Sequence, residues 1–388
     1  MPYTHVDCFS GPGGFCTGLH AAGFETKVAI EYIKSCVDTY SANHPEVHVI
    51  HSDIREVTAD QILPYIPKEG IDLVTSGMPC ETFSTAGNSS RAAYDDRQFL
   101  FREGIRIAQI VNAKILFENV PNIQNKRIAK DSKELVIDYL KKELEEAGYG
   151  NFKEFVLDAS KYGVPQKRKR FFILASKDSQ IDVSQTPVET TPDKEVTVKD
   201  AFIDIPEVIA NTWTENPNYL KEESEYTRLM KNDSFWKRIT KEKKLLNHLP
   251  MNHRKNILER FTILQQGEGL KGLFERLTAE ELAEYQSRKV IPKTIYVKRN
   301  YRLKWDEASP TVTSHCLDEF VHPVQPRALT VRECARLQSF PDSYDFVGGK
   351  YLTAHDNREE QDKYEQIGDA VPPLLAYAWG IKIKELLN

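Results

Sequence analysis

Near its start the chain reads Asp7-Cys8-Phe9-Ser10-Gly11-Pro12-Gly13-Gly14-Phe15, a glycine-rich stretch between a short apolar run and a helical pattern. Glycines at such a junction let the backbone approach a ligand closely, and the free N–H groups at the start of the helix favour anionic or polar groups. The spacing is not the G-x-G-x-x-G of dinucleotide-binding turns, which disfavours a small-molecule dehydrogenase. The stretch predicts a ligand-binding turn after the first strand of an α/β domain.

Apolar, β-branched runs alternate with helical patterns over the first 175 residues. The expected strands are His5–Phe9, Lys27–Glu31, His48–Ile54, Ile71–Ser76, Lys114–Asn119, Glu154–Asp158 and Arg170–Ala175. The expected helices are Phe101–Val111 and Lys133–Ala147, followed after Pro326 by Leu329–Phe340 and Leu374–Leu387. This alternation predicts an α/β fold, a doubly wound and mostly parallel sheet covered by helices on both faces.

The bulk composition is that of an ordinary globular protein. The chain has 388 residues, of which 40% are hydrophobic and 28% charged, and at roughly 150 residues per domain this predicts two or three domains. No apolar run approaches the about 18 residues of a membrane span, and the start lacks the features of a signal peptide. Six cysteines are too sparse for a disulfide framework. We therefore expect a soluble intracellular protein in a reducing compartment.

Charge is distributed unevenly along the chain. The net charge is −5, yet Lys221–Lys304 holds 20 Lys and Arg against 11 Asp and Glu, a net of +9, which leaves −14 for the rest. A basic segment on an acidic body suits a polyanion that meets one face only; the alternative is a solvated, lysine-rich helical face. From about Asn211 to Lys304 the strand–helix alternation is lost, and a polar linker over Asp178–Pro192 precedes it. We expect a second, smaller domain there.

Acidic residues end two of the expected strands. Glu31 ends the second strand and Asp53 lies at the end of the third. Carboxylates at the carboxyl ends of parallel strands are placed to accept hydrogen bonds from ribose hydroxyls. The alternative is surface charge and loop punctuation. Together with the glycine turn they indicate a nucleoside-bearing cofactor.

Three further features bear on catalysis. Cys80 follows Pro79 at the end of the fourth strand, where a thiolate could be a nucleophile, although a lone cysteine is more often a small buried hydrophobe. Glu118 ends the fifth strand and, if buried with a raised pKa, could donate a proton; otherwise it is a capping or solvated glutamate. In Gln166-Lys-Arg-Lys-Arg170, Arg168 and Arg170 point to one side of a strand, or they belong to a solvated edge.

A zinc site formed by the closely spaced histidines is rejected. His44, His48 and His51 have no cysteine spaced to join them, and their spacing on a loop entering a strand does not converge. We expect no metal.

Six blocks of this sequence, in this order, resemble the cytosine-5 DNA methyltransferases. They are Phe9 to Gly14, Gly77 to Cys80, Glu118 to Val120, Gln166 to Arg170, Arg327 to Gln338, and Gln366 to Pro372. The segment between Arg170 and Arg327 corresponds to the variable target-recognition region of that family. The resemblance implies a Rossmann-like S-adenosylmethionine-dependent methyltransferase domain, formed by residues 1–200 and completed by 326–388, with a target-recognition domain over 201–325. The final helix is expected beside the first strand.

The resemblance also implies residue roles. Cys80 would attack carbon 6 of cytosine, Glu118 would hold the N3 edge and Arg168 the O2. Glu31 would hold the ribose of the cofactor, and Asp53 with Ile54 its adenine. The cofactor pocket as a whole would comprise Phe9, Ser10, Gly11, Gly13, Gly14, Glu31, Tyr32, Asp53, Ile54, Pro79, Asp369, Ala370 and Val371. The other substrate contacts would be Pro79, Ser84, Asn119 and Arg170.

The implied activity is methylation of carbon 5 of a flipped cytosine in duplex DNA, leaving S-adenosylhomocysteine. The implied partners are double-stranded DNA, contacted at its phosphates by the basic segment, and a separate restriction endonuclease; we expect a monomer. Met78, Glu81-Thr82 and Asp369 depart from the usual pattern, and Asp369 either alters cofactor affinity or lies exposed outside the pocket. A tRNA cytosine methyltransferase is disfavoured by the missing Cys-Phe-Thr signature after Arg170. A non-catalytic DNA-binding relative is disfavoured because the catalytic residues are present.

Overall fold

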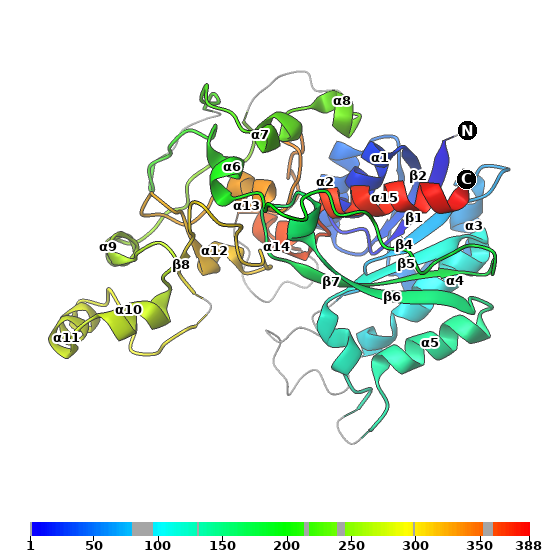
Figure 1. Cartoon of the computed structure of the whole chain (residues 1–388), viewed down its shortest axis with the longest axis horizontal. Coiled ribbons are helices and arrows are strands. Elements are labelled where there is room, and N and C mark those ends of the chain that lie inside the picture. The colour runs from blue at the N-terminus through cyan, green and yellow to red at the C-terminus, as the bar shows by residue number, and fades with distance from the viewer. Residues whose placement is uncertain are drawn as a thin grey trace.

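A seven-stranded sheet forms the centre of the chain (Figure 1). The computed structural model describes residues 2–79, 96–129, 132–212, 217–238, 245–297, 299–351 and 360–388. The strands, in the order they take across the sheet, are β3 (His48–His51), β2 (Phe24–Glu31), β1 (Tyr3–Cys8), β4 (Leu73–Ser76), β5 (Lys114–Asn119), β7 (Lys169–Ser176) and β6 (Asn151–Asp158). β7 runs antiparallel to β5 and β6 on either side of it, and the other strand pairs of this sheet are parallel. The prediction of a mostly parallel α/β sheet is confirmed.

The central strands are apolar on both sides because both faces of the sheet are covered. In β5, Ile115 and Phe117 belong to one hydrophobic core and Leu116 to the other, as the two-residue period of a strand requires. Helices α4 (Phe101–Val111) and α5 (Val136–Glu146) pack into the first core, and α1 (Gly14–Ala22) and α15 (Pro373–Leu387) into the second. Figure 1 shows the two pairs of helices on opposite sides of the sheet.

The remaining helices are mostly short. They are α2 (Lys34–Asn43), α3 (Ala59–Ile62), α6 (Val198–Phe202), α7 (Glu225–Met230), α8 (Asp233–Trp236), α9 (Lys255–Ile263), α10 (Leu270–Arg276), α11 (Ala279–Ser287), α12 (Cys316–Glu319), α13 (Val331–Leu337) and α14 (Lys363–Asp369). None of the described helices is long and apolar enough to cross a membrane.

The predicted ends of the strands and helices agree best with the structure where the hydrophobic pattern of the sequence is strongest. The strand Lys114–Asn119 and the helix Phe101–Val111 coincide with β5 and α4. The expected strand His48–Ile54 was too long, since β3 ends at His51 and Asp53 instead caps a short 3-10 helix over Ile54–Glu56. A side-chain oxygen that accepts a backbone N–H favours such a helix start over a continued strand.

Helices α9, α10 and α11 project away from the sheet (Figure 1). They share a small core with neighbouring loop residues and with the two-stranded sheet of β8 (Tyr301–Arg302) and β9 (Phe320–Val321). That core comprises Phe261, Leu264, Leu273, Val290, Ile291 and Val321. Other residues of the same region, among them Tyr226, Met230 and Trp236, join the larger core next to the sheet. A separate domain over 201–325 stays a prediction.

The last helix packs on the first. An ideal Cβ on Gly18 of α1 would lie 2.1 Å from the Pro373 carbonyl oxygen, and one on Gly380 of α15 would lie 2.6 Å from Ala22 Cβ. The two helices are therefore in backbone contact, which only glycine permits. The final helix was expected beside the first strand; Tyr3 of β1 does contact its end, donating a hydrogen bond to Asn388 at 2.5 Å, but the close packing of α15 is on α1.

Candidate active site

The glycine turn between β1 and α1 has an unusual backbone. Phe9, Gly11 and Gly13 have φ values of 56°, 55° and 97°, in the left-handed region that favours glycine. An ideal Cβ on Gly13 would lie 2.6 Å from the Tyr344 hydroxyl, and one on Gly14 would lie 2.2 Å from the Val371 carbonyl. Glycine is needed at these positions because the C-terminal part of the chain closes against the turn.

Glu31, at the end of β2, is buried beside this turn. One carboxylate oxygen accepts a hydrogen bond from the Gly11 N–H at 2.7 Å, and the other accepts from Tyr32 and Ile33 at 2.8 and 2.7 Å. Burial raises the pKa of Glu31, while these three N–H groups act in the opposite direction. A carboxylate has about four acceptor positions, so Glu31 can still accept a bond from a ligand hydroxyl.

Two other predicted cofactor residues surround the turn. The Ser10 hydroxyl is buried and has no hydrogen-bond partner among the described residues. Tyr32 is exposed at the end of β2. A buried hydroxyl without a partner costs free energy unless a ligand or water satisfies it, so Ser10 fits a polar ligand at this turn.

Asp53 and Ile54 lie at the end of β3, next to Glu31. The Ser52 N–H donates to the Glu31 carbonyl at 3.1 Å, which joins the two strand ends. The Asp53 carboxylate accepts bonds from the Arg55 backbone and guanidinium, and the Arg55 side chain lowers its pKa. Ile54 is buried. The structure thus brings both residues to the same rim, with the Asp53 charge already paired.

The C-terminal segment after α14 supplies the other side of the rim. Ala370 and Val371 are buried, and the Val371 carbonyl faces Gly14. Asp369 is exposed instead and accepts a hydrogen bond from Gln361 at 2.9 Å. Its exposure fits the alternative in which Asp369 lies outside the pocket.

Glu118 and Arg170 form an ion pair beside the turn. The Arg170 Nε lies 2.9 Å from Glu118 Oε1, and each side chain is about a tenth exposed. Burial raises the pKa of Glu118, against the opposing charges of Arg170 and Arg168. An ideal Cβ on Gly77 would lie 3.6 Å from Glu118 Oε2 and 3.9 Å from the Phe9 carbonyl. Gly77 therefore lies between the pair and the glycine turn, which places an acid near the turn.

Asn119 holds the loop that follows β4. Its amide donates to the Met78 carbonyl at 3.2 Å, and its side-chain oxygen accepts from the Val120 N–H at 2.8 Å. Pro79 is the last described residue of that loop. The predicted nucleophile Cys80 and the predicted substrate contact Ser84 lie outside the described residues.

Arg168 is placed differently from the prediction. Its guanidinium is buried and donates to the carbonyls of Val312 at 2.6 Å, Gly368 at 2.8 Å and Ala370 at 3.1 Å. It fastens the C-terminal segment to the start of β7. Arg170 forms the ion pair with Glu118, and the Arg168 charge also acts on Glu118; the role of Arg168 at the cytosine stays a prediction.

One polar group near the turn escaped the sequence analysis. Asp7 is fully buried in β1 and accepts a hydrogen bond from the Thr75 hydroxyl at 2.6 Å, and that hydroxyl also lies 2.7 Å from His5 Nε2. Burial raises the pKa of Asp7 to about 8. The signal in the sequence was two polar side chains, His5 and Asp7, at alternate positions of an otherwise apolar strand.

The family match covers nearly the whole chain. The family model for C-5 cytosine-specific DNA methylase matches residues 3–385. The chain belongs to this family. This methylase is 31% identical over 97% of its length to the Type II methyltransferase M.DdeI of Desulfomicrobium norvegicum, covering 88% of that protein. It is also 32% identical to M1.HphI of Haemophilus parahaemolyticus, with 97% of this chain and 86% of the relative covered.

Solved structures agree in fold with the methylase. A chain described as a DNA modification methyltransferase encoded within an Escherichia coli prophage superposes with a TM-score of 0.73 at 24% identity, covering 100% of this chain and 99% of that one. The Dnmt2 methyltransferase of Schizosaccharomyces pombe gives a TM-score of 0.51 at 18% identity, with 100% and 99% covered. The prediction of a cytosine-5 DNA methyltransferase is confirmed at the level of family and activity, and methylases of this kind use S-adenosylmethionine.

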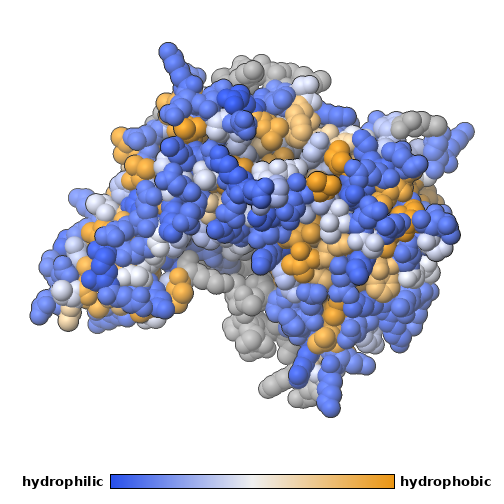
Figure 2. Space-filling view, in the orientation of Figure 1, coloured by the Kyte–Doolittle hydropathy of each residue, from blue (hydrophilic) through white to orange (hydrophobic). Residues whose placement is uncertain are grey.

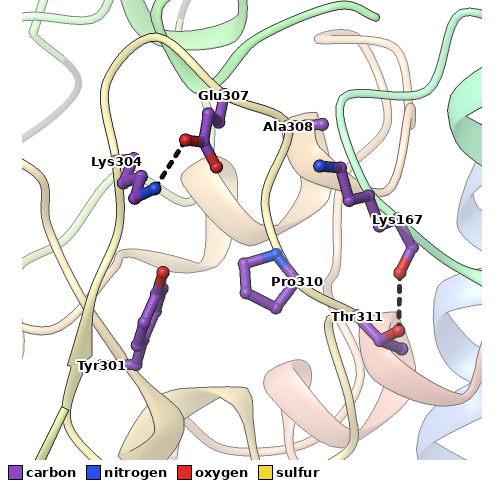
Figure 3. A pocket seen from close by; sticks show the side chains of 7 residues that line it. All are labelled: Lys167, Tyr301, Lys304, Glu307, Ala308, Pro310 and Thr311. Atoms are coloured by element: carbon purple, nitrogen blue, oxygen red, sulfur yellow. Dashed lines mark hydrogen bonds and ion pairs between the residues drawn. The ribbon is translucent and has the colours of Figure 1, made fainter. Parts of the chain in front are cut away.

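A cavity of about 320 Å³ lies elsewhere on the methylase, between Lys167 and the segment Tyr301–Thr311 (Figure 3). Lys304 forms an ion pair with Glu307 at 2.6 Å, and the Thr311 hydroxyl donates to the Lys167 carbonyl at 2.8 Å. The residues that line the cavity include none of the predicted catalytic or cofactor residues.

Proposed function

We propose that this methylase transfers a methyl group to carbon 5 of a flipped cytosine within a specific duplex sequence, through a covalent bond between Cys80 and carbon 6. The observation that carries the proposal is the buried Glu118–Arg170 pair at 2.9 Å. Gly77, at the start of the loop that leads to Cys80, separates this pair from the glycine turn. An acid and a guanidinium thus lie next to the glycine turn and to the start of the loop that leads to the predicted nucleophile, which supports the proposal.

Each group would have a defined part in the reaction. Carbon 5 of cytosine is a poor nucleophile until the Cys80 thiolate adds to carbon 6, a step that breaks the 5,6 double bond. Glu118, whose pKa burial raises, donates a hydrogen bond to N3 and stabilises the added ring. Arg170 orients Glu118 and reaches the adjacent O2. Once carbon 5 carries the methyl group, loss of its proton expels Cys80 and restores the double bond.

The cofactor would bind at the strand ends beside the glycine turn. When bound, S-adenosylmethionine supplies an electrophilic methyl group. The turn Phe9 to Gly14 would approach it closely, Glu31 would accept from its ribose hydroxyls, and Asp53 with Ile54 would flank the adenine. The unpartnered Ser10 hydroxyl supports this assignment. Tyr32, Pro79, Ala370 and Val371 would complete the pocket, and the exposed Asp369 would lie outside it.

DNA would be held by residues of the region 201–325. Its basic segment and the projecting helices α9–α11 support a target-recognition role, since phosphate contacts offset the cost of flipping a base. Figure 2 shows mostly hydrophilic residues on the visible face of these helices. The protein would act as a monomer on double-stranded DNA. The relatives are Type II methyltransferases, which supports a separate cognate endonuclease as a partner.

Transfer of tritiated methyl groups from S-adenosylmethionine tests the proposal. Unmethylated genomic DNA and bulk tRNA are offered to the wild type and to Cys80→Ala, whose cofactor binding is measured in parallel. We expect label in DNA that the Cys80→Ala variant does not produce, and bisulfite sequencing would then locate the site. Label in tRNA only would favour the tRNA alternative. Label in DNA retained by Cys80→Ala would contradict the covalent step.

A further inference from the structure

Three metal-ligating side chains meet away from the active site. His20 lies on α1, and His44 and Glu46 lie in the connection between α2 and β3. The Nδ1 atoms of His20 and His44 are each 3.7 Å from Glu46 Oε1, and the three ligand atoms all lie within 4.8 Å of one another. This trio differs from the closely spaced histidines considered in the sequence, because His20 comes from another element and His48 stacks on Tyr65.

Hydrogen bonding fixes which nitrogen of His44 is available. The Thr17 hydroxyl donates its single proton to the Gly13 carbonyl at 2.8 Å, so at 3.2 Å from His44 Nε2 it accepts a hydrogen bond from that nitrogen. His44 Nε2 therefore carries the proton and Nδ1 carries the lone pair. That Nδ1 is buried and has no hydrogen-bond partner among the described residues. It faces Glu46, which is also an acceptor.

Two acceptors that face each other across 3.7 Å require a cation or a proton between them. A metal ion that accepts a lone pair from each of the three groups fits this arrangement, because all three ligand atoms converge within 4.8 Å of one another. Neutral imidazoles and a carboxylate are the forms that bind a transition metal. Ligand atoms at zinc distances and tetrahedral angles lie about 3.4 Å apart, so small rotations of the partly exposed His20 and Glu46 suffice.

We propose that His20, His44 and Glu46 bind a divalent transition metal ion, zinc foremost, which ties α1 to the connection between α2 and β3. The Thr17 bond would orient His44 in the way that outer hydrogen bonds orient metal-bound histidines. Glu25 favours positive charge at His20, whereas Lys237 and Arg238 oppose it. The site offers three protein ligands, and the positive side chains of Lys237 and Arg238 lie nearby. We therefore expect it to bind zinc more weakly than a structural site with four protein ligands does.

Calorimetric titration of the chelator-treated full-length protein with zinc chloride at pH 7.5 tests the site. We expect one ion per chain and a higher thermal unfolding midpoint when zinc is present. His20→Ala and Glu46→Gln alter partly exposed side chains, and each should weaken zinc binding by at least about tenfold. The control His315→Ala removes an exposed histidine outside the trio and should bind as the wild type does.

The outcomes separate this site from adventitious binding. Zinc binding that persists in both His20→Ala and Glu46→Gln overturns the proposal, as does its absence from the wild type. Binding that is lost in Cys80→Ala instead would place the ion on the predicted reactive thiol and would also overturn it. Circular dichroism of each variant confirms that it is folded. None of these measurements depends on methyl transfer.

Discussion

Arg168 and Arg170 are two residues apart in one motif, yet their guanidinium groups have different environments. Arg168 donates to three backbone carbonyls from the C-terminal half of the chain. Arg170 pairs with Glu118 next to the glycine turn. At the scale of single residues, one arginine therefore holds the fold together, and the other lies in the proposed active site.

This contrast predicts opposite phenotypes for the two alanine variants. Arg168→Ala removes the side-chain donor to the buried carbonyls of Val312 and Gly368, while Ala370 keeps a bond from Gln338, and should lower the free energy of unfolding by roughly 3 kcal/mol. Arg170→Ala removes a predicted substrate contact and should lower kcat/KM on the order of a hundredfold, with a smaller loss of stability than Arg168→Ala because Glu118, whose pKa burial already raises, can take up a proton once its partner is gone. Urea unfolding and methyl-transfer kinetics measure the two effects. A destabilised Arg170→Ala and a stable but inactive Arg168→Ala would reverse our assignment.

Asp7 predicts a pH dependence of stability. Its pKa is about 8 in the folded chain against an ordinary 3.8, so between these values the folded state binds a proton that the unfolded state has lost. Its contribution to stability is therefore full below about pH 4 and falls as the pH rises to about 8, by up to roughly 1.4 kcal/mol per pH unit. Asp7→Asn should flatten this part of the curve in urea unfolding from pH 5 to 8.

The control for this experiment is Asp38→Asn, a partly exposed carboxylate on α2. It should follow the wild-type curve over the same range. Equal slopes for wild type and Asp7→Asn would show that Asp7 is ionised in the folded protein.

At the scale of the elements, α1 packs so closely against the C-terminal part of the chain that there is no room for an added side chain at Gly14 or Gly18. Its first residue touches the C-terminal segment and its middle touches α15, each through a glycine. Ordinarily alanine is the better helix former by about 1 kcal/mol. At these positions the added methyl group would meet a backbone carbonyl, which cannot move aside as a flexible side chain can.

Gly18→Ala should therefore destabilise the protein although it lies in a helix. Its Cβ would lie 2.1 Å from the Pro373 carbonyl, and overpacking of this kind typically costs about 1–3 kcal/mol. Gly272→Ala in α10 is the matched control, since its Cβ would meet only the flexible Glu268 side chain at 3.1 Å. Thermal unfolding should show a lower midpoint for the first variant and an unchanged or higher one for the second. Equal midpoints would mean that α15 can shift.

The sequence predicts elements well where the pattern is local. The alternation of β5 and the amphipathic period of α4 set their bounds, and Glu31 and Glu118 were expected at the rim because parallel strands end on one edge. The partners of Arg168 could not be predicted, since they lie at residues 312, 368 and 370. Whether His20 and His44 come together likewise depends on how α1 packs against the rest of the chain, and the spacing of residues in the sequence does not predict this.

At the scale of the whole molecule, the uneven charge predicts how DNA is bound. Arg254 and Lys255 are exposed at the start of the projecting α9. Replacing both with alanine should weaken binding to every duplex sequence and reduce the slope of log affinity against log salt by about 2. Fluorescence anisotropy at several salt concentrations measures this. Lys142→Ala on α5 is the control, and an equal loss there would mean that the basic segment has no special role.

The contact between α1 and α15 has a consequence for the newly made protein. Residues as far apart as Gly18 and Pro373 must meet before the glycine turn is enclosed, and contacts between such distant residues form late in folding. While the ribosome is still making the second half of the chain, the apolar face of α1 has no α15 to cover it. We therefore expect the nascent chain to be a client of chaperones, and to become able to bind its methyl donor only once translation has passed α15.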